Sequence, residues 1–245
     1  MSTSTSVAFV TGGNRGLGLE TARGLGKQGI TVVIGVRDLA KGDVAVQELK
    51  QAGINAEAVA FDALNPATFQ DIYKYLERKY GKLDILVNNA GVALGPLFGN
   101  NASTASQDLL KQTFEVNFFS VIALTQVLLP LIKKAPAGRI VNLASILGSL
   151  GVHQMPDSPI AAAKELAYNA SKTALNAFTV HLADELKDSS IKVNSAHPGW
   201  VKTDMGGAEA PMEVSEGGKT SVQLATLPAN GPTGGFFHLG EPLPW

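Results

Sequence analysis

The sequence predicts an α/β protein built on a doubly wound parallel sheet of about seven strands, with helices on both faces. Short apolar runs rich in β-branched residues alternate along the chain with longer segments of helical periodicity. This alternation is typical of right-handed strand–helix–strand crossovers. In addition, each motif of chemical interest follows a strand candidate or begins a helix candidate, and ligands of such sheets bind beyond the carboxyl ends of the strands.

The expected elements fill the chain without an internal repeat, a low-complexity linker or a break in composition. Strands are expected at residues 7–10, 31–36, 56–61, 85–87, 139–143, 192–195 and 235–238. Helices are expected at residues 18–28, 41–51, 67–80, 107–134, 167–187 and 215–227. This continuity predicts one domain over residues 1–245.

The composition narrows the classes of function. Of the 245 residues, 45% are hydrophobic and 17% are charged, and the formal net charge is -1 from 20 basic and 21 acidic residues. Such a balance predicts neither a nucleic-acid partner nor a membrane-surface partner. The chain has no cysteine, which excludes disulfides and thiolate nucleophiles and fits a reducing compartment.

The most apolar stretch, residues 118–132, is interrupted by three polar residues and Pro130. This pattern is typical of a buried helix and not of a membrane span. Residues 1–6 are rich in serine and threonine without a basic flank, and the apolar run after them is too short for a signal peptide. The sequence therefore predicts a soluble, cytoplasmic protein.

A glycine-rich turn follows the first expected strand: residues 11–18 read TGGNRGLG and lead into a helix. Glycines permit a sharp turn and a close approach to a pyrophosphate, whose charge the helix N-terminus stabilises. The spacing differs from the common G-x-G-x-x-G fingerprint, so a glycine-rich turn of an unrelated α/β protein is the alternative. The expected contacts with a dinucleotide are Gly12, Asn14, Arg15, Gly16, Leu17 and Gly18.

The end of the second expected strand, at Val36, indicates which dinucleotide binds. An NAD site places a carboxylate there for the ribose 2′-hydroxyl, and valine cannot take that role. Arg37 follows, and Arg15 stands in the glycine-rich turn, so two guanidinium groups could hold a 2′-phosphate. This favours NADPH as the cofactor. Two alternatives stay open: the arginines are solvated surface residues, or Asp38 reaches the ribose.

Two more segments lie at strand ends. Asp62, after the third strand, has the position of an adenine contact, and a turn or N-cap aspartate is its alternative. After the fourth strand, residues 88–91 read NNAG, where small and amide residues can both brace the sheet and admit the cofactor's ribose. The expected contacts there are Asn89, Ala90 and Gly91.

Tyr168 and Lys172 are four residues apart in an expected helix, which places them on one face. A phenol ionises near pH ~10 in water, and a neighbouring cation lowers its pKa toward the working range. The pair therefore predicts a tuned proton donor. Ser145 follows the fifth strand, and Asn117 lies within a long apolar helix, where an unpaired amide is costly.

With these motifs in order, and PGWVKTD at residues 198–204 after the sixth strand, the chain resembles the short-chain dehydrogenase/reductase family over nearly its whole length. Within the family it is most similar to the NADPH-dependent carbonyl reductases, on TGGNRG at 11–16, VRD at 36–38 and PGWVKTDM at 198–205. The resemblance implies a Rossmann-type fold and an enzyme that reduces ketones or aldehydes to alcohols with NADPH.

The resemblance also implies catalytic roles. Tyr168 would protonate the developing alkoxide as hydride arrives, and Ser145 would polarise the carbonyl by a hydrogen bond. Lys172 would lower the pKa of Tyr168 and hold the nicotinamide ribose, and Asn117 would anchor a water that links Lys172 to solvent. The expected cofactor contacts beside Tyr168 and Lys172 are Pro198, Gly199, Val201 and Thr203, with Thr203 on the carboxamide. A buried helix aromatic at Tyr168 and a simple cap at Ser145 are the alternatives.

Ser145 and Tyr168 are 23 positions apart, more than is typical of the family, which predicts an insertion at about residues 147–165. In carbonyl reductases an insertion here lies near the pocket and can cover the helix face used by oligomers. A homo-oligomer stays open, and a monomer is favoured. A substrate loop is expected at about residues 200–230. The expected apolar pocket wall comprises Ile146, Met155, Trp200 and Met205, with Val92, Leu94 and His153 as neighbours.

The four histidines show no metal-ligand spacing, so no metal site is expected. His197, directly before Pro198, is interpreted as a structural histidine, with a second polar group near the nicotinamide as the alternative. The expected partner is a small-molecule carbonyl substrate. Two other hypotheses are an NAD(P)-dependent alcohol dehydrogenase of the same family and a non-catalytic NADPH-sensing protein, which would need no intact Ser–Tyr–Lys set.

Overall fold

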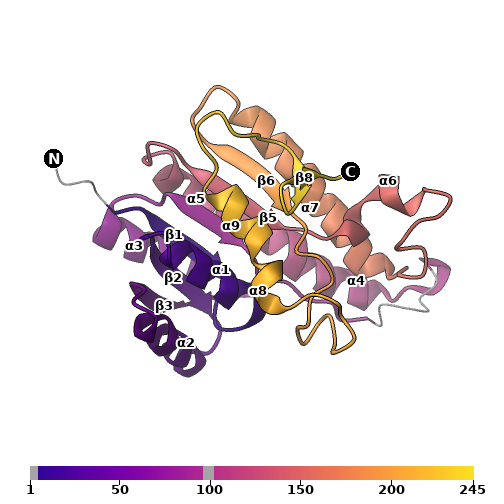
Figure 1. Ribbon diagram of the computed structural model, residues 1–245, viewed down its shortest axis with the longest axis horizontal. Helices are drawn as coiled ribbons and strands as arrows, with labels where there is room; N and C mark the ends of the chain where they lie inside the picture. Colours follow the sequence, from indigo (N-terminus) through magenta and orange to yellow (C-terminus); the bar gives the residue numbers. More distant parts are fainter. Residues whose placement is uncertain (1–4, 96–101) are drawn as a thin grey trace.

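A computed structural model describes residues 5–95 and 102–245 of the chain (Figure 1). Its strands form one eight-stranded sheet in the order β3-β2-β1-β4-β5-β6-β7-β8, parallel except for the antiparallel pair of β7 and β8. The strands are β1 Val7–Thr11, β2 Thr31–Val36, β3 Ala56–Ala60, β4 Ile85–Asn88, β5 Arg139–Leu143, β6 Lys192–Ala196, β7 Phe236–His238 and β8 Glu241–Pro242. The strand order reverses between β1 and β4, which makes the carboxyl ends of these strands the expected place for a ligand.

Helices cover both faces of the sheet (Figure 1). The longer helices are α1 Gly16–Gly26, α2 Leu39–Gln51, α3 Ala67–Tyr80, α5 Ser120–Ile132 and α7 Leu166–Glu185. The shorter ones are α4 Gln107–Phe114, α6 Leu150–His153, α8 Val214–Gly217 and α9 Lys219–Ala225, with the 3₁₀ turns η1 Ala102–Thr104 and η3 Ile146–Gly148 and the π-helical turn η2 Glu115–Phe119. Although they are far apart in sequence, α1, α8 and α9 pack together, which brings the C-terminal part of the chain beside the glycine-rich turn.

Strand β1 shows why the strand candidates are apolar throughout. Val7 and Phe9 belong to the core on the face covered by α3, α5 and α7, whereas Ala8 and Val10 belong to the core under α1, α2 and α9. Successive side chains of a strand point to opposite faces, so a strand buried on both sides cannot alternate apolar with polar residues. All four side chains are 0% exposed.

The expected helix at 107–134 is three elements in the structure, α4, η2 and α5. By length and hydropathy the run Gln107–Ile132 is apolar enough to cross a membrane, but 44% of its most apolar window is buried within the protein. Leu124, Leu128 and Leu131 of this run lie in the core with α3 and α7. It is therefore a core helix, as its polar interruptions predict. The expected helix at 215–227 is also divided, into α8 and α9. Residues 1–4, part of the segment considered for a signal peptide, lie outside the described residues.

Candidate active site

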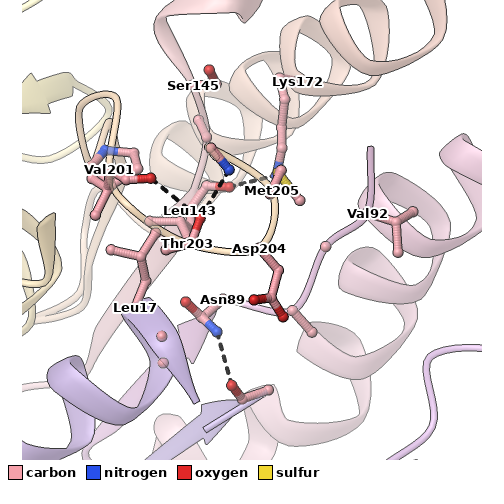
Figure 2. Close-up of a pocket in the computed structure, with 18 of the residues that line it drawn as sticks. Leu17, Asn89, Val92, Leu143, Ser145, Lys172, Val201, Thr203, Asp204 and Met205 are labelled. Atoms are coloured by element: carbon pink, nitrogen blue, oxygen red, sulfur yellow. Dashed lines mark hydrogen bonds between the residues drawn. The ribbon is translucent and has the colours of Figure 1, made fainter. Parts of the chain in front are cut away.

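A cavity of about 730 Å³ lies beyond the carboxyl ends of the central strands. In the view of Figure 2, Ser145 and Lys172 stand at one side and Leu17 and Asn89 at the other, with the loop that carries Met205 between them. Every residue expected to contact the cofactor lines this cavity: Gly12, Asn14, Arg15, Gly16, Leu17, Gly18, Arg37, Asp62, Asn89, Ala90, Gly91, Tyr168, Lys172, Pro198, Gly199, Val201 and Thr203.

The glycine-rich turn is shaped by its backbone and tied to the neighbouring strand. Gly12 and Gly16 have φ angles of +66° and +52°, a region that favours glycine. The Thr11 hydroxyl accepts the backbone N–H groups of Asn89 and Ala90 (both 2.9 Å), and the Asn89 amide donates to the Thr11 carbonyl (2.7 Å). Helix α1 begins at Gly16 without a side-chain cap, which leaves its first N–H groups available to an anion.

The structure separates the roles of the three residues at the end of β2. The strand ends at Val36, and Arg37 lines the cavity. Asp38 instead caps α2, because its carboxylate accepts the N–H groups of Ala40 (3.0 Å) and Lys41 (3.3 Å). The alternative in which Asp38 binds the ribose is therefore not favoured, since that carboxylate is engaged and is not part of the lining.

Two other lining residues have partners within the protein. The Arg15 guanidinium pairs with the Asp204 carboxylate from the loop after β6, and both side chains are largely exposed. Asp62 both lines the cavity and accepts the N–H of Leu64 (3.0 Å), so a turn role is compatible with a place in the lining.

Tyr168 and Lys172 lie on α7 and are 7% and 4% exposed. The Lys172 ammonium is 5.6 Å from the centroid of the Tyr168 ring and donates to the Leu143 carbonyl (2.7 Å). Burial lowers the pKa of Lys172 to about 8. The pKa of Tyr168 is raised to about 12, mainly by burial. Its hydrogen bond with Ser145 opposes this rise, and the Glu165 carboxylate adds to it.

The expected lowering of the Tyr168 pKa by Lys172 is wrong for this structure. The shift has the opposite sign, because removing a phenolate from water costs more than its neighbours return. The Lys172 ammonium lies over the ring and is bound to a main-chain carbonyl. Tyr168 is therefore a phenol at neutral pH, the form that donates a proton.

Glu165 is a residue that the sequence analysis missed. It is 1% exposed and caps α7 three residues before Tyr168, accepting the N–H groups of Ala167 and Tyr168. This cap fixes the start of the helix that carries both Tyr168 and Lys172. A glutamate directly before an apolar helical run was the signal that could have identified it.

Ser145 follows β5, is 8% exposed and lines the cavity. Its hydroxyl oxygen also accepts the N–H of Leu147 (3.2 Å), so the capping role and a place beside Tyr168 are compatible. The side-chain amide of Asn117 is bonded within the protein. Its Oδ1 accepts the Val92 N–H (2.8 Å), and its Nδ2 donates to the Val92 carbonyl (2.8 Å) and to the Ser171 hydroxyl (3.0 Å). Asn117 is fully buried in η2 and does not line the cavity.

Gly91 lies between Asn117 and Lys172. A Cβ atom at this position would be 3.2 Å from the Asn117 Oδ1 and 3.4 Å from the Lys172 Nζ. Such contacts are tighter than side chains normally tolerate, so the close approach of these groups depends on the glycine. The side chain of Asn117 thus fixes the loop after β4 against α7, while its Oδ1 keeps a second lone pair.

Most of the expected pocket wall is present. Ile146, Trp200, Met205 and Val92 line the cavity, and Trp200 closes its own loop by donating to the Gly206 carbonyl (2.8 Å). Met155 and Leu94 do not line it, and their side chains are 47% and 48% exposed. Met155, which was expected in this wall, is not among the lining residues. The insertion supplies the lining residues Leu147, Pro159, Ile160, Ala162 and Ala163 instead.

His153 braces this insertion from behind the wall. Its Nε2 faces the Leu147 carbonyl (3.0 Å) and its Nδ1 faces the Lys164 ammonium (2.7 Å), so one ring links the start and the end of the segment. Over residues 5–95 and 102–245, no group of three or more histidine, cysteine, aspartate or glutamate side chains is arranged to hold a metal ion.

Comparison with known proteins places these features in context. Residues 6–213 match a family model described as short chain dehydrogenase. The chain is similar to Short-chain dehydrogenase/reductase 1 of Saponaria officinalis (34% identical, 97% of this chain and 95% of that protein) and to carbonyl reductase [NADPH] 1 of Mus musculus (33% identical, 100% of both). Among solved structures it is similar to the NADPH-bound carbonyl reductase from chicken fatty liver (TM-score 0.83, 26% identity, 98% of this chain and 99% of that chain).

Proposed function

Because this chain belongs to the short-chain dehydrogenase family, we propose that it is an oxidoreductase that reduces ketones and aldehydes to alcohols with NADPH. One observation carries the proposal: Tyr168, Lys172 and Ser145 meet at one wall of a cavity whose far end is lined by the glycine-rich turn and two arginines. The relatives named carbonyl reductase [NADPH] 1 support the same activity.

The residues around the cavity fit NADPH. The uncapped start of α1 would hold the pyrophosphate, and Arg15 and Arg37 would hold the 2′-phosphate. The segment from Asn89 to Gly91 would lie along the ribose, with Asp62 at the adenine. Lys172 would bind the nicotinamide ribose, and Thr203 the carboxamide, within a turn formed with Pro198, Gly199 and Val201. When bound, NADPH supplies the hydride.

The side chains of this protein supply the proton and the polarisation. Ser145 donates a hydrogen bond to the carbonyl oxygen and so stabilises the negative charge that develops there. Tyr168 then gives its phenolic proton to the same oxygen. With a pKa of about 12, Tyr168 holds that proton at neutral pH and is in the form that the reduction requires. Glu165 and Asn117 would act by fixing α7 and the loop after β4.

The pocket wall favours carbonyl compounds with an apolar body. Ile146, Ile160, Trp200 and Met205 present apolar surface near Ser145 and Tyr168. Bulky or aromatic ketones would bury more of their surface here than sugars, whose hydroxyl groups would lose water without gaining partners.

A panel assay tests the proposal. Purified protein is mixed with NADPH or NADH and with a series of aryl and aliphatic ketones and aldehydes, and the loss of the reduced nicotinamide absorbance is followed. We expect faster turnover with NADPH, with aryl ketones preferred. Binding of NADPH without turnover of any compound would favour a non-catalytic, cofactor-sensing protein, and faster oxidation of the product alcohols would favour an alcohol dehydrogenase.

We further propose a single-domain, cytoplasmic monomer. The sheet draws strands from both ends of the chain, in support of one domain over residues 1–245. The insertion packs on α7, with the Thr173 hydroxyl donating to the Gly148 carbonyl (2.8 Å), so part of a helix face is already covered. Light scattering after size-exclusion chromatography would overturn the monomer if it gave twice the mass of 25.6 kDa.

A further inference from the structure

His197 links two loops of the active site through one nitrogen. Its Nδ1 accepts the N–H of Ile146 (3.2 Å), directly after Ser145, and the N–H of Gly199 (3.4 Å), directly after Pro198. Beyond the ends of β5 and β6, the two segments are still joined by the backbone hydrogen bond from the Ala144 N–H to the Ala196 carbonyl (2.9 Å). One residue farther along, the bond from the Ile146 N–H to the His197 side chain joins them.

The hydrogen bonds assign the protonation state of the ring. A nitrogen that accepts two N–H groups must carry a lone pair, so the ring is neutral with its proton on Nε2. Burial, and to a smaller extent the nearby His238, whose ring centroid is 4.9 Å away, together lower the pKa of His197 to about 3. The Nδ1 acceptor therefore persists at every pH at which the enzyme would be assayed.

The position of His197 is fixed independently of the two loops. The backbone N–H of His197 donates to the Phe237 carbonyl (2.8 Å), and the backbone carbonyl of His197 contacts the Nδ1 of His238 (2.9 Å). Both partners lie on β7. The imidazole also packs beside Phe236, with ring centroids 6.5 Å apart. Because the backbone of His197 is anchored to β7, its ring can hold the two loops in a defined place.

We propose that His197 is a positioning residue that holds the turn carrying Ser145 and the turn carrying Gly199 in register with each other. The inference rests on the proposed function, in which Ser145 polarises the carbonyl and residues 198–203 hold the nicotinamide. The distance between hydride donor and carbonyl carbon depends on both turns together. Misplacement of reacting groups by about 1 Å can lower a rate on the order of 10²-fold.

Two substitutions separate this role from direct contact with the substrate. His197→Asn keeps an acceptor oxygen one bond beyond Cγ, where Nδ1 stands, but removes the Nε2–H donor. His197→Leu keeps a similar volume and removes the acceptor. If His197 positions the turns, the Asn variant should retain kcat within about threefold, whereas the Leu variant should lose on the order of 10–100-fold. The Kd for NADPH, measured by protein fluorescence, should change less, because the pyrophosphate and the adenosine are held elsewhere.

A double-mutant cycle with Ser145→Ala shows whether the effect passes through Ser145. On that background His197→Leu should cost less in kcat than it does in the otherwise wild-type protein, since only the turn carrying Gly199 is left to position. His181→Leu, at an exposed site on α7, is the matched control and should keep wild-type kcat. If the Leu variant fails to fold by circular dichroism, His197→Gln replaces it, because its acceptor lies one bond farther out and should reproduce the loss.

Each result bears on a different claim. Wild-type kcat in a folded Leu or Gln variant would overturn the positioning role, as would full additivity with Ser145→Ala. An Asn variant as slow as the Leu variant would assign His197 a direct donor role through Nε2 and would also overturn it. Absence of NADPH-dependent turnover in the wild-type protein would instead overturn the proposed function.

Discussion

The two halves of the cavity are built by different means. At the cofactor half, the backbone bond from the Gly12 N–H to the Gly35 carbonyl (2.8 Å) ties the glycine-rich turn to the sheet, and the main-chain N–H groups of Asn89 and Ala90 donate to the Thr11 hydroxyl. At the substrate half, the wall consists of side chains such as Ile160 and Met205, carried on segments that brace themselves. His153 and the bond from Trp200 to Gly206 provide that bracing. The cofactor half is thus fixed by backbone geometry, and the substrate half depends on the identity of its side chains.

This difference predicts that substitutions in one half should leave the other intact, whereas substitutions at the junction should act mainly on kcat. Tyr168, Ser145 and Lys172 form the junction, since all three line the cavity between the glycine-rich turn and the insertion. The variants below test this separation.

Tyr168→Phe removes the phenolic proton donor and preserves the buried ring. We expect kcat to fall on the order of 10²–10⁴-fold, the usual contribution of a general acid. The Kd for NADPH should stay within a few-fold, because the ring keeps its packing on α7. Stopped-flow measurement of NADPH oxidation gives the rate, and fluorescence titration gives the Kd. Retention of more than a tenth of kcat would show that another group delivers the proton.

Arg37→Asp places a carboxylate at the end of β2 and removes a donor to the 2′-phosphate. The ratio of kcat/KM for NADPH over NADH should fall on the order of 10–100-fold, as a charged hydrogen bond of about 1.5–3 kcal/mol is lost and repulsion replaces it. The KM for the ketone, a property of the other half, should not change. Lys41→Asp, an exposed change of the same charge on α2, is the control. Unchanged cofactor preference in Arg37→Asp would contradict the assignment of Arg37.

Lys172 provides a test by pH. Its pKa is lowered from 10.5 to about 8 by burial, so between these values the unfolded state binds a proton that the native state does not. Stability therefore rises with pH across this window, and as pH falls the loss is complete near pH 8, below which both states bind the proton. Relative to Lys172→Met, the free energy of unfolding of the wild type should increase by about 2 kcal/mol between pH 8 and pH 10. Urea titrations at both pH values measure it, and parallel curves would show that Lys172 keeps its charge.

The sequence predicted local features of the site well. The pairing of Tyr168 with Lys172 depends only on helical spacing, and the absence of a carboxylate at Val36 depends only on where a strand ends. Both features are local, and the structure places these residues accordingly on α7 and at the end of β2.

Features that depend on tertiary packing were missed. The raised pKa of Tyr168 reflects burial, which no residue spacing reveals. The π-helical turn that turns Asn117 toward Val92 interrupts an otherwise regular apolar helix pattern. The insertion contains Met155 as well as Ile160, and only the path of the chain decides which of them lines the cavity.

Ile160→Ala, with Met155→Ala as its matched control, is the most specific test of the substrate half. Both residues are apolar and belong to the same insertion, but only Ile160 lines the cavity, whereas Met155 is 47% exposed. Losing buried methyl and methylene groups should raise the KM for a bulky aryl ketone by about 5–20-fold, at ~0.8 kcal/mol per CH₂. The KM for NADPH should not change in either variant, and Met155→Ala should match the wild type with every substrate. Equal effects of the two substitutions would mean that the insertion acts through its overall stability, and the substrate half would then share the backbone-determined character of the cofactor half.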